Sequence, residues 1–264
     1  MIQGIEFLRH LNLRREFDLL WMLTRNQFTL QYKRTHLGIL WSLLNPLLLA
    51  LVFYIAFTVV LKIKRQDFSL FLLSGLFPWT WFAHSVSAST VSIVNHKTMI
   101  KKFLFPKHYL IAALIFSESV HFLFSIPILT GLVYYYGKTA DWVWLVGIPV
   151  FFIIQLYMTL GVSLISSVIN VYFRDFQFIV AFFLNILFWL TPILYQLDTV
   201  PEAYRLIFLY CNPLSPLILS WRELFMSHNI QTSWLILSVL NSLWIFILGI
   251  LIFQKFKTHF DEIL

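Results

Sequence analysis

The stretch VWLVGIPVFFIIQLYMTLGVSLISSVINVYF, residues 143–173, contains no Asp, Glu, Lys or Arg. A bilayer core about 30 Å thick is crossed by roughly 20 apolar helical residues, so this stretch is long enough to span a membrane. Four further stretches lack the same four residue types, at 35–61, 68–96, 177–197 and 224–254. The segment 106–136 is similar but has one internal acid, Glu118. We therefore predict an all-α membrane protein with six transmembrane helices.

The composition excludes most soluble functions. Hydrophobic residues make up 59% of the 264 residues and charged residues only 12%, which is too few to coat a soluble domain. The single cysteine excludes an intrachain disulfide and a cysteine-based metal site, and we expect no metal. No Walker A loop is present. We therefore expect no catalytic residues and no cofactor in this chain, which shows no energy source of its own.

The positive charges predict the orientation. A cytoplasmic N-terminus places the basic N-terminal segment and the basic segment 97–107 inside, as the positive-inside rule favours. The basic segment 62–65 then lies outside, against the rule. Both termini are expected in the cytoplasm. The expected transmembrane domain, 36–264, has spans at about 36–62, 69–95, 106–136, 143–170, 177–197 and 231–254.

Four segments outside these spans have patterns of their own. Residues 1–35 alternate between apolar and charged at helical spacing, which is typical of an amphipathic helix at the membrane interface. The segments 95–107 and 170–176 are short and charged, and each predicts either a small helix that docks onto a cytoplasmic partner or a plain turn between two spans. The region 198–230 contains an apolar run, 206–221, that is too short to cross comfortably and is interrupted by Asn212-Pro213 and Pro216, so it predicts short re-entrant helices shielded by protein.

Aromatic residues are concentrated at 77–82 and 188–195. Aromatic faces stack on the C–H faces of sugars, so a polysaccharide path can use rings where an ion channel uses carbonyls or charges. Membership of the interfacial aromatic belt is the alternative for each ring. For Glu118, a hydrogen-bonded structural role is favoured over a transport role. The candidate path residues are Trp79, Trp81, Phe82, Trp189 and Tyr195.

A series of motifs resembles the permease subunits of ABC transporters that export lipid-linked polysaccharides, most closely the O-antigen and teichoic-acid branches. The resemblance covers nearly the whole chain, and its strength lies in the order and spacing of the motifs. They are YKRTHLGILW at 32–41, LNP at 44–46, GLFPW at 75–79, KFLFP at 102–106, NVYFRD at 170–175, TPILY at 191–195 and YCNPL at 210–214.

The resemblance implies a homodimer in the cytoplasmic (inner) membrane that binds two copies of an ATPase subunit and no nucleic acid. ATP and Mg would be bound by that partner. The substrate path would lie between the two copies, lined by the first, second and fifth spans. Arg34 is a candidate contact for a lipid diphosphate. The coupling contacts implied are Lys101, Lys102, Phe103, Phe173, Arg174 and Asp175.

Three alternatives remain open for the substrate: a capsule polysaccharide, a drug or a small lipid. A self-contained secondary carrier is disfavoured, because the chain shows no paired intramembrane charges and no detectable internal repeat.

Overall fold

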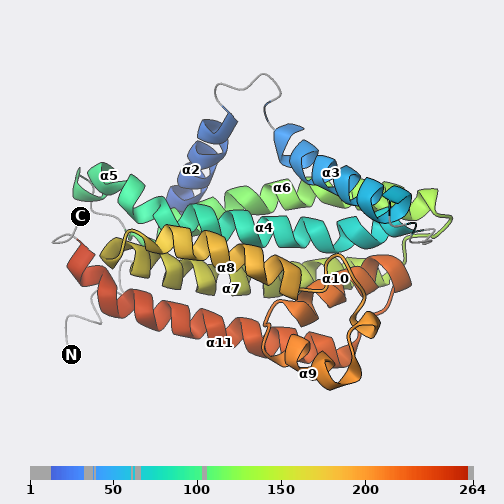
Figure 1. Cartoon of the computed structure of the whole chain (residues 1–264). Coiled ribbons are helices and arrows are strands. Elements are labelled where there is room, and N and C mark those ends of the chain that lie inside the picture. Colours follow the sequence, from blue (N-terminus) through green and yellow to red (C-terminus); the bar gives the residue numbers. More distant parts are fainter. Residues whose placement is uncertain are drawn as a thin grey trace.

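The computed structural model describes residues 13–32, 38, 40–60, 62, 67–102 and 106–260. Within these ranges every regular element is helical, which confirms the all-α class (Figure 1). Arg34 and Phe103 lie outside the described residues. The elements are α2 (Leu13–Tyr32), α3 (Leu40–Tyr54), the π-helix η1 (Ile55–Val60), α4 (Phe68–Asn95), α5 (Lys97–Lys102), α6 (His108–Tyr135), α7 (Val143–Tyr172), α8 (Phe176–Leu190), η2 (Leu197–Thr199), α9 (Glu202–Tyr210), α10 (Ser215–Ser227), α11 (Thr232–Phe256) and η3 (Lys257–His259).

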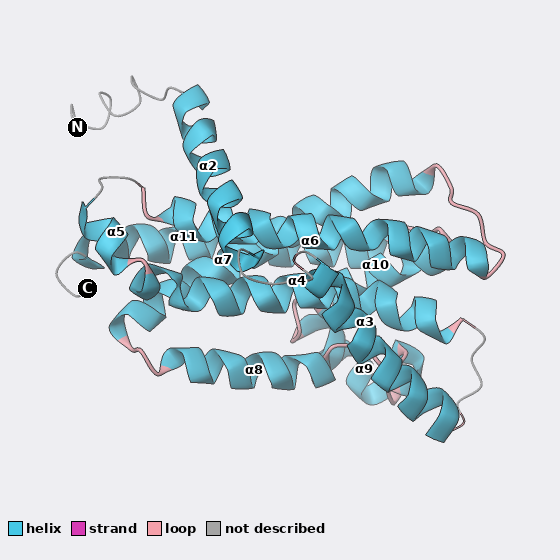
Figure 2. Cartoon of the chain, turned by 90° about the horizontal axis from the view of Figure 1, so that it is seen from above, coloured by secondary structure: helices cyan, strands magenta, loops and turns pink. Residues whose placement is uncertain are grey.

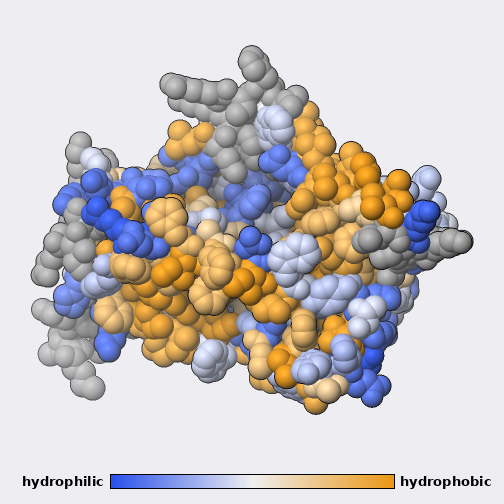
Figure 3. All heavy atoms as spheres, in the orientation of Figure 1, coloured by the Kyte–Doolittle hydropathy of each residue, from blue (hydrophilic) through white to orange (hydrophobic). Residues whose placement is uncertain are grey.

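The long helices α4, α6, α7 and α11 and the shorter α8 run side by side, while α2 and α3 lean outward on one side of the bundle (Figure 1). The short helices α9 and α10 lie at one end of the bundle, and α5 and the end of α11 lie at the other. Seen from above, α8 stands at the edge of the bundle (Figure 2). Apolar side chains cover the long helices, and hydrophilic side chains gather at the end that carries α5 (Figure 3).

Four of the described helical stretches are long and apolar enough to cross a membrane, namely Leu43–Val60, His108–Tyr135, Val143–Tyr172 and Thr232–His259. Helix α4 has a suitable length of 28 residues but is less apolar. It lies in the interior, packed against α3, α6, α7, α8 and α10, so few of its side chains face outward. Some of its hydroxyls bond to the helix's own carbonyls, as Ser74 does to Phe71 O (2.9 Å) and Thr90 to Val86 O (2.7 Å).

Helix α8 is shorter than the expected segment 177–197, because it ends at Leu190. Its 15 residues are about 22 Å long, less than the thickness of a bilayer core. Pro192 disfavours helical geometry in the residue before it, and Thr191 is accordingly extended (φ −87°, ψ 135°). The following four residues nonetheless stay in the interior, since the side chains from Thr191 to Leu194 are buried.

Helices α7 and α11 pack with their backbones in contact. Gly161 and Gly249 face each other, and a Cβ on Gly249 would lie 2.6 Å from Gly161 O. Small residues permit such close helix approach in membranes, where dispersion and interhelical contact replace the hydrophobic effect. This contact fixes α11 against the bundle.

Candidate functional site

The two segments expected to couple to a partner lie at the same end of the bundle. Helix α5 follows α4, and the residues from Phe173 to Asp175 form the turn between α7 and α8 (Figure 1). The side chains of Lys101, Phe173, Arg174 and Asp175 are exposed, so they are available to another protein. Lys102 ends α5, and its side chain is outside the described residues.

A hydrophobic cluster lies beneath these exposed residues, and we call it the end cluster. It is formed by Leu23 of α2, Ile100 of α5, Ile93 of α4, Leu110, Ile111, Ala113 and Ile115 of α6, Leu164, Val168 and Val171 of α7, and Phe253 and Phe260. Phe260 is fully buried, and its ring lies 5.7 Å from that of Phe253 and 6.5 Å from that of Tyr172. The coupling segments therefore share one packed base.

Helix α2 is attached to this same end by polar and aromatic contacts. The Tyr109 hydroxyl donates to Glu16 Oε2 (3.0 Å), and the rings of Phe28 and His121 stack with centroids 5.1 Å apart. His96 Nδ1 donates to the carbonyl of Ser92 (2.8 Å), so its Nε2 accepts from Gln27 Nε2 (3.2 Å). These contacts tie α2 to α6 and to the junction between α4 and α5.

The rings expected to line a substrate path fall into two environments. Trp81 is buried and stacked between Phe122 (5.0 Å) and Phe152 (4.9 Å). Trp79 is also buried but contacts Phe188 of α8 (5.7 Å). The structure thus places Trp81 deep within the subunit and Trp79 beside α8.

The exposed ring is Trp189, with 58% of its surface accessible. It packs edge-on against Phe188 (5.6 Å), and its carbonyl accepts from the Tyr195 hydroxyl (3.1 Å). Phe188 also stacks on Phe53 of α3 (6.0 Å). Phe188 therefore connects α3, α4 and α8, which are the helices of the first, second and fifth expected spans. Phe53 was not among the residues picked from the sequence, because nothing distinguishes it from its apolar neighbours.

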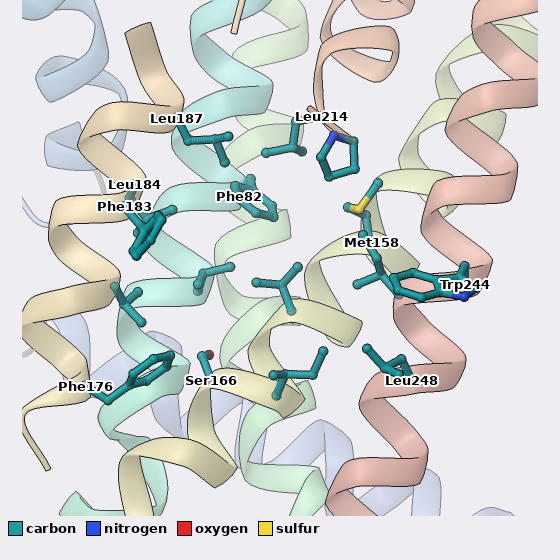
Figure 4. Close-up of a pocket in the computed structure, with 16 residues that line it drawn as sticks. Phe82, Met158, Ser166, Phe176, Phe183, Leu184, Leu187, Leu214, Trp244 and Leu248 are labelled. Atoms are coloured by element: carbon teal, nitrogen blue, oxygen red, sulfur yellow. The ribbon is translucent and has the colours of Figure 1, made fainter. Parts of the chain in front are cut away.

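Phe82 lines an apolar cavity of about 410 Å³ between α4, α7, α8 and α11 (Figure 4). Phe183 and Leu187 of α8 line one side, and Trp244 of α11 lines the other. Ser166 supplies the only side-chain hydroxyl of this lining. The cavity suits hydrocarbon and offers no acid, base or nucleophile.

A buried arginine holds the segment that follows α8. Arg222 of α10 is 5% exposed and donates to the carbonyls of Ile193 (2.6 Å) and Tyr195 (3.4 Å). Its guanidinium lies 3.8 Å above the ring of Phe71 and also packs against α4 at Gly75, where a Cβ would lie 2.9 Å from Nη2. The sequence alone does not place Arg222, because which face of α10 it occupies depends on tertiary packing.

A second set of polar contacts holds the same segment that follows α8. Asn212 Nδ2 donates to Thr191 Oγ1 (2.9 Å), while its Oδ1 accepts from the backbone N–H of Leu214 (3.1 Å). The Thr191 hydroxyl donates in turn to Leu187 O (2.6 Å). Helix α10 is thus fixed to the end of α8 by two independent side chains.

A buried amide crosses the centre of the bundle. Gln155 of α7 donates to Pro78 O of α4 (2.7 Å) and accepts from Trp221 Nε1 of α10 (2.7 Å). Sequence reasoning missed Gln155, although an amide near the middle of the charge-free stretch 143–173 was the available signal. These two bonds join three helices around one side chain.

No catalytic constellation is present among the described residues. They contain no group of three or more His, Cys, Asp or Glu side chains able to hold a metal ion. Glu118 is 8% exposed, and its Oε2 lies 4.0 Å from His84 Nδ1. The site is a set of surfaces and apolar spaces suited to moving a molecule.

The four described helical stretches that are long and apolar enough to cross a membrane are those of a multi-pass membrane protein. The family model described as "ABC-2 type transporter" matches residues 18–226. The chain belongs to this family, which confirms the resemblance found in its motifs. It is 39% identical over 248 residues to an O-antigen export system permease protein RfbA of Klebsiella pneumoniae, covering 94% of this chain and 95% of the relative. A Myxococcus xanthus protein of the same name is 35% identical over 213 residues, covering 80% of this chain and 82% of the relative.

Proposed function

We propose that this chain is the channel-forming permease of an ATP-driven exporter that moves a lipid-linked polysaccharide, O-antigen or teichoic acid, across the cytoplasmic membrane. The observation that carries the proposal is the 39% identity to an O-antigen export permease over almost the full length of both chains. The absence of a Walker A loop and of a catalytic constellation in the described residues supports a separate ATPase partner.

The proposed subunit crosses the membrane six times, with α4 and α8 added to the four membrane-length helices. Helix α8 alone is too short, but Thr191–Leu194 continues it as buried non-helical chain. Irregular backbone is tolerated at membrane depth only where protein satisfies its polar groups. Arg222 supplies that satisfaction at the carbonyls of Ile193 and Tyr195, and Asn212 bonds the side-chain hydroxyl of Thr191 beside them. On this basis α9 and α10 form the re-entrant pair, and both termini are cytoplasmic.

The proposed working unit is a homodimer with the path between its two copies. The outward faces of α3 and α8 are apolar and exposed in the single chain, as at Leu48 and Val52 of α3 and Phe178 and Phe182 of α8. Trp189 is exposed on α8, at the side where Phe188 connects α8 to α3. Of the five predicted path residues, Trp189 has the most accessible face for stacking on sugars.

The proposed ATPase partner, present as two copies, docks on the end that carries α5 and the Phe173–Asp175 turn. Lys101, Arg174 and Asp175 are exposed there above the end cluster. Charged contacts at a protein interface set register and specificity, and they transmit force only if their base is rigid. The packing of Phe260 and Ile100 supplies such a base.

Complementation with a matched pair of tryptophan variants tests the proposal. In cells that lack the native permease, the wild-type chain together with its ATPase should restore surface polysaccharide, and purified permease alone should not hydrolyse ATP. Trp189→Ala should reduce export at unchanged membrane abundance. The control Trp142→Ala removes a comparably exposed ring, 71% accessible, from the start of α7. Equal export by the two variants would contradict the role of Trp189. ATP turnover by the pure permease would contradict the proposal that a separate subunit hydrolyses ATP.

A further inference from the structure

A second cavity, of about 280 Å³, lies between α6, α7 and α11, near the point where α11 ends. It is separate from the proposed substrate path, because none of its lining residues belongs to α3, α4 or α8. Its lining consists of His108 and Ala112 of α6, Leu160 and Leu164 of α7, Phe246, Ile250, Phe253 and Gln254 of α11, and Lys257 of η3.

The cavity is an elongated slot along α11. Its α11 residues are spaced so that they share one helix face, from Phe246 to Gln254, with Lys257 just beyond. Eleven residues at 1.5 Å per residue separate Phe246 from Lys257, a length of about 16 Å. A hydrocarbon chain that runs along a transmembrane helix has this shape and direction.

The slot is polar at one end and apolar along the rest. His108, Gln254 and Lys257 are exposed at the mouth, whereas Leu164 and Phe253 are buried at its wall. An apolar cavity without polar partners does not hold ordered water. In a membrane protein the molecules available to fill it are lipids.

Among the described residues, the mouth carries the ammonium group of Lys257. Lys107 Nζ donates to the backbone carbonyl of Lys257 (3.5 Å), so a second ammonium group lies close to the mouth. The Glu16 carboxylate of α2 accepts from the Tyr109 hydroxyl (3.0 Å). Basic pockets between transmembrane helices bind anionic lipid head groups.

We infer that this slot binds one anionic glycerophospholipid of the surrounding bilayer. Its phosphate lies at Lys257 and His108, and one acyl chain runs along α11 past Phe253 and Ile250. The slot selects the head group by charge and accepts the chain by shape. A membrane lipid is favoured over the polyprenyl carrier of a polysaccharide because the slot is remote from the helices assigned to the path.

Native mass spectrometry of the full-length, delipidated protein tests this inference. The protein is titrated with phosphatidylglycerol and with phosphatidylcholine of identical acyl chains, and the bound fraction gives an apparent Kd for each. We expect one molecule of phosphatidylglycerol to bind more tightly than phosphatidylcholine. One lysine near an anionic group contributes enough that Lys257→Gln should weaken phosphatidylglycerol binding about fivefold.

The chain offers a matched control two residues away. Lys255 does not line the slot, and its ammonium lies over the Phe256 ring (5.7 Å), so Lys255→Gln should bind like the wild type. Ala112→Leu should fill the slot and lower binding of both lipids, and its thermal unfolding without lipid shows whether it is folded. Because the Lys257 side chain is exposed, we expect Lys257→Gln to fold even if Ala112→Leu does not.

Three outcomes overturn the inference. Equal affinity for the two lipids would contradict a contact with the head group. Equal losses of phosphatidylglycerol affinity in Lys257→Gln and Lys255→Gln would contradict the assignment of the lipid to this slot. Competition by a polyprenyl diphosphate at lower concentration than phosphatidylglycerol assigns the slot to the substrate carrier instead. The first two results leave the proposed export function untouched, and the third would move the carrier's binding site into this slot without removing export itself.

Discussion

Replacing Gly249 by alanine tests the close contact between α7 and α11. The new Cβ would lie 2.6 Å from Gly161 O and 2.9 Å from Gly161 Cα. Both are backbone atoms, so no side-chain rotation relieves the overlap. The two helices must separate by several tenths of an ångström, and the neighbouring contacts along both helices loosen with them.

Two effects of opposite sign decide how much Gly249→Ala changes the free energy of unfolding. Alanine is favoured over glycine in a helix interior by at most about 1 kcal/mol. Overpacking a tight interface costs about 1–3 kcal/mol. Because the clash is with backbone, the upper part of that range applies, and the net free energy of unfolding should fall by about 1–2 kcal/mol.

Thermal unfolding of the purified protein in detergent measures this change. A loss of 1 kcal/mol lowers the Tm of a chain of this size by roughly 2–4 °C. Gly131→Ala is the matched control, since a Cβ there meets nothing within 4 Å and the residue is also helical. The control should gain up to about 1 kcal/mol. Gly249→Ala that unfolds at or above the wild-type temperature would refute the argument.

Three further changes test other contacts. Arg222→Met removes the donor to Ile193 O and should lower the free energy of unfolding by about 1–3 kcal/mol, measured by thermal unfolding. Arg222→Lys should keep only part of the wild-type stability, and full stability in that variant would contradict the need for a forked donor. Gln155→Leu orphans two buried groups and should cost about 1–3 kcal/mol in the same assay, whereas an unchanged Tm would show that the amide is dispensable. Arg174→Glu should lower ATP-driven export or dissociate the ATPase, measured by co-purification, with permease abundance unchanged; wild-type export from an intact complex would exclude Arg174 as a coupling contact.

The helical class follows from the sequence because a long charge-free stretch in a membrane has few secondary structures open to it other than a helix. The expected and observed bounds of a helix agree closely where local sequence signals mark its ends. Helix α4 was expected at 69–95 and lies at Phe68–Asn95. The end of α8 was set wrongly because hydropathy continues to Leu197, while backbone geometry stops the helix before Pro192. Apolar character therefore locates a buried segment better than it locates the end of a helix.

The site was less predictable than the fold. Clusters of rings are visible in the sequence, but their burial depends on which helix faces meet, so Trp81 and Trp189 look alike until the bundle is assembled. Arg222 and Gln155 each satisfy backbone carbonyls or side chains far away in the sequence. Such contacts leave no local pattern. The coupling, path and head-group roles of the chosen residues stay predictions.

The end cluster has a consequence for how the protein is made. It joins Leu23, Ile100 and Val171 to Phe260, so its members are separated by most of the chain. A ribosome that has completed α8 has already produced both coupling segments, but Phe253 and Phe260 have yet to be translated. The base beneath the proposed docking surface is therefore finished only when synthesis passes Phe260, and an unfinished or shortened permease presents an incomplete surface to the ATPase. If the proposed docking surface is correct, truncation before Phe260 should weaken binding of the ATPase.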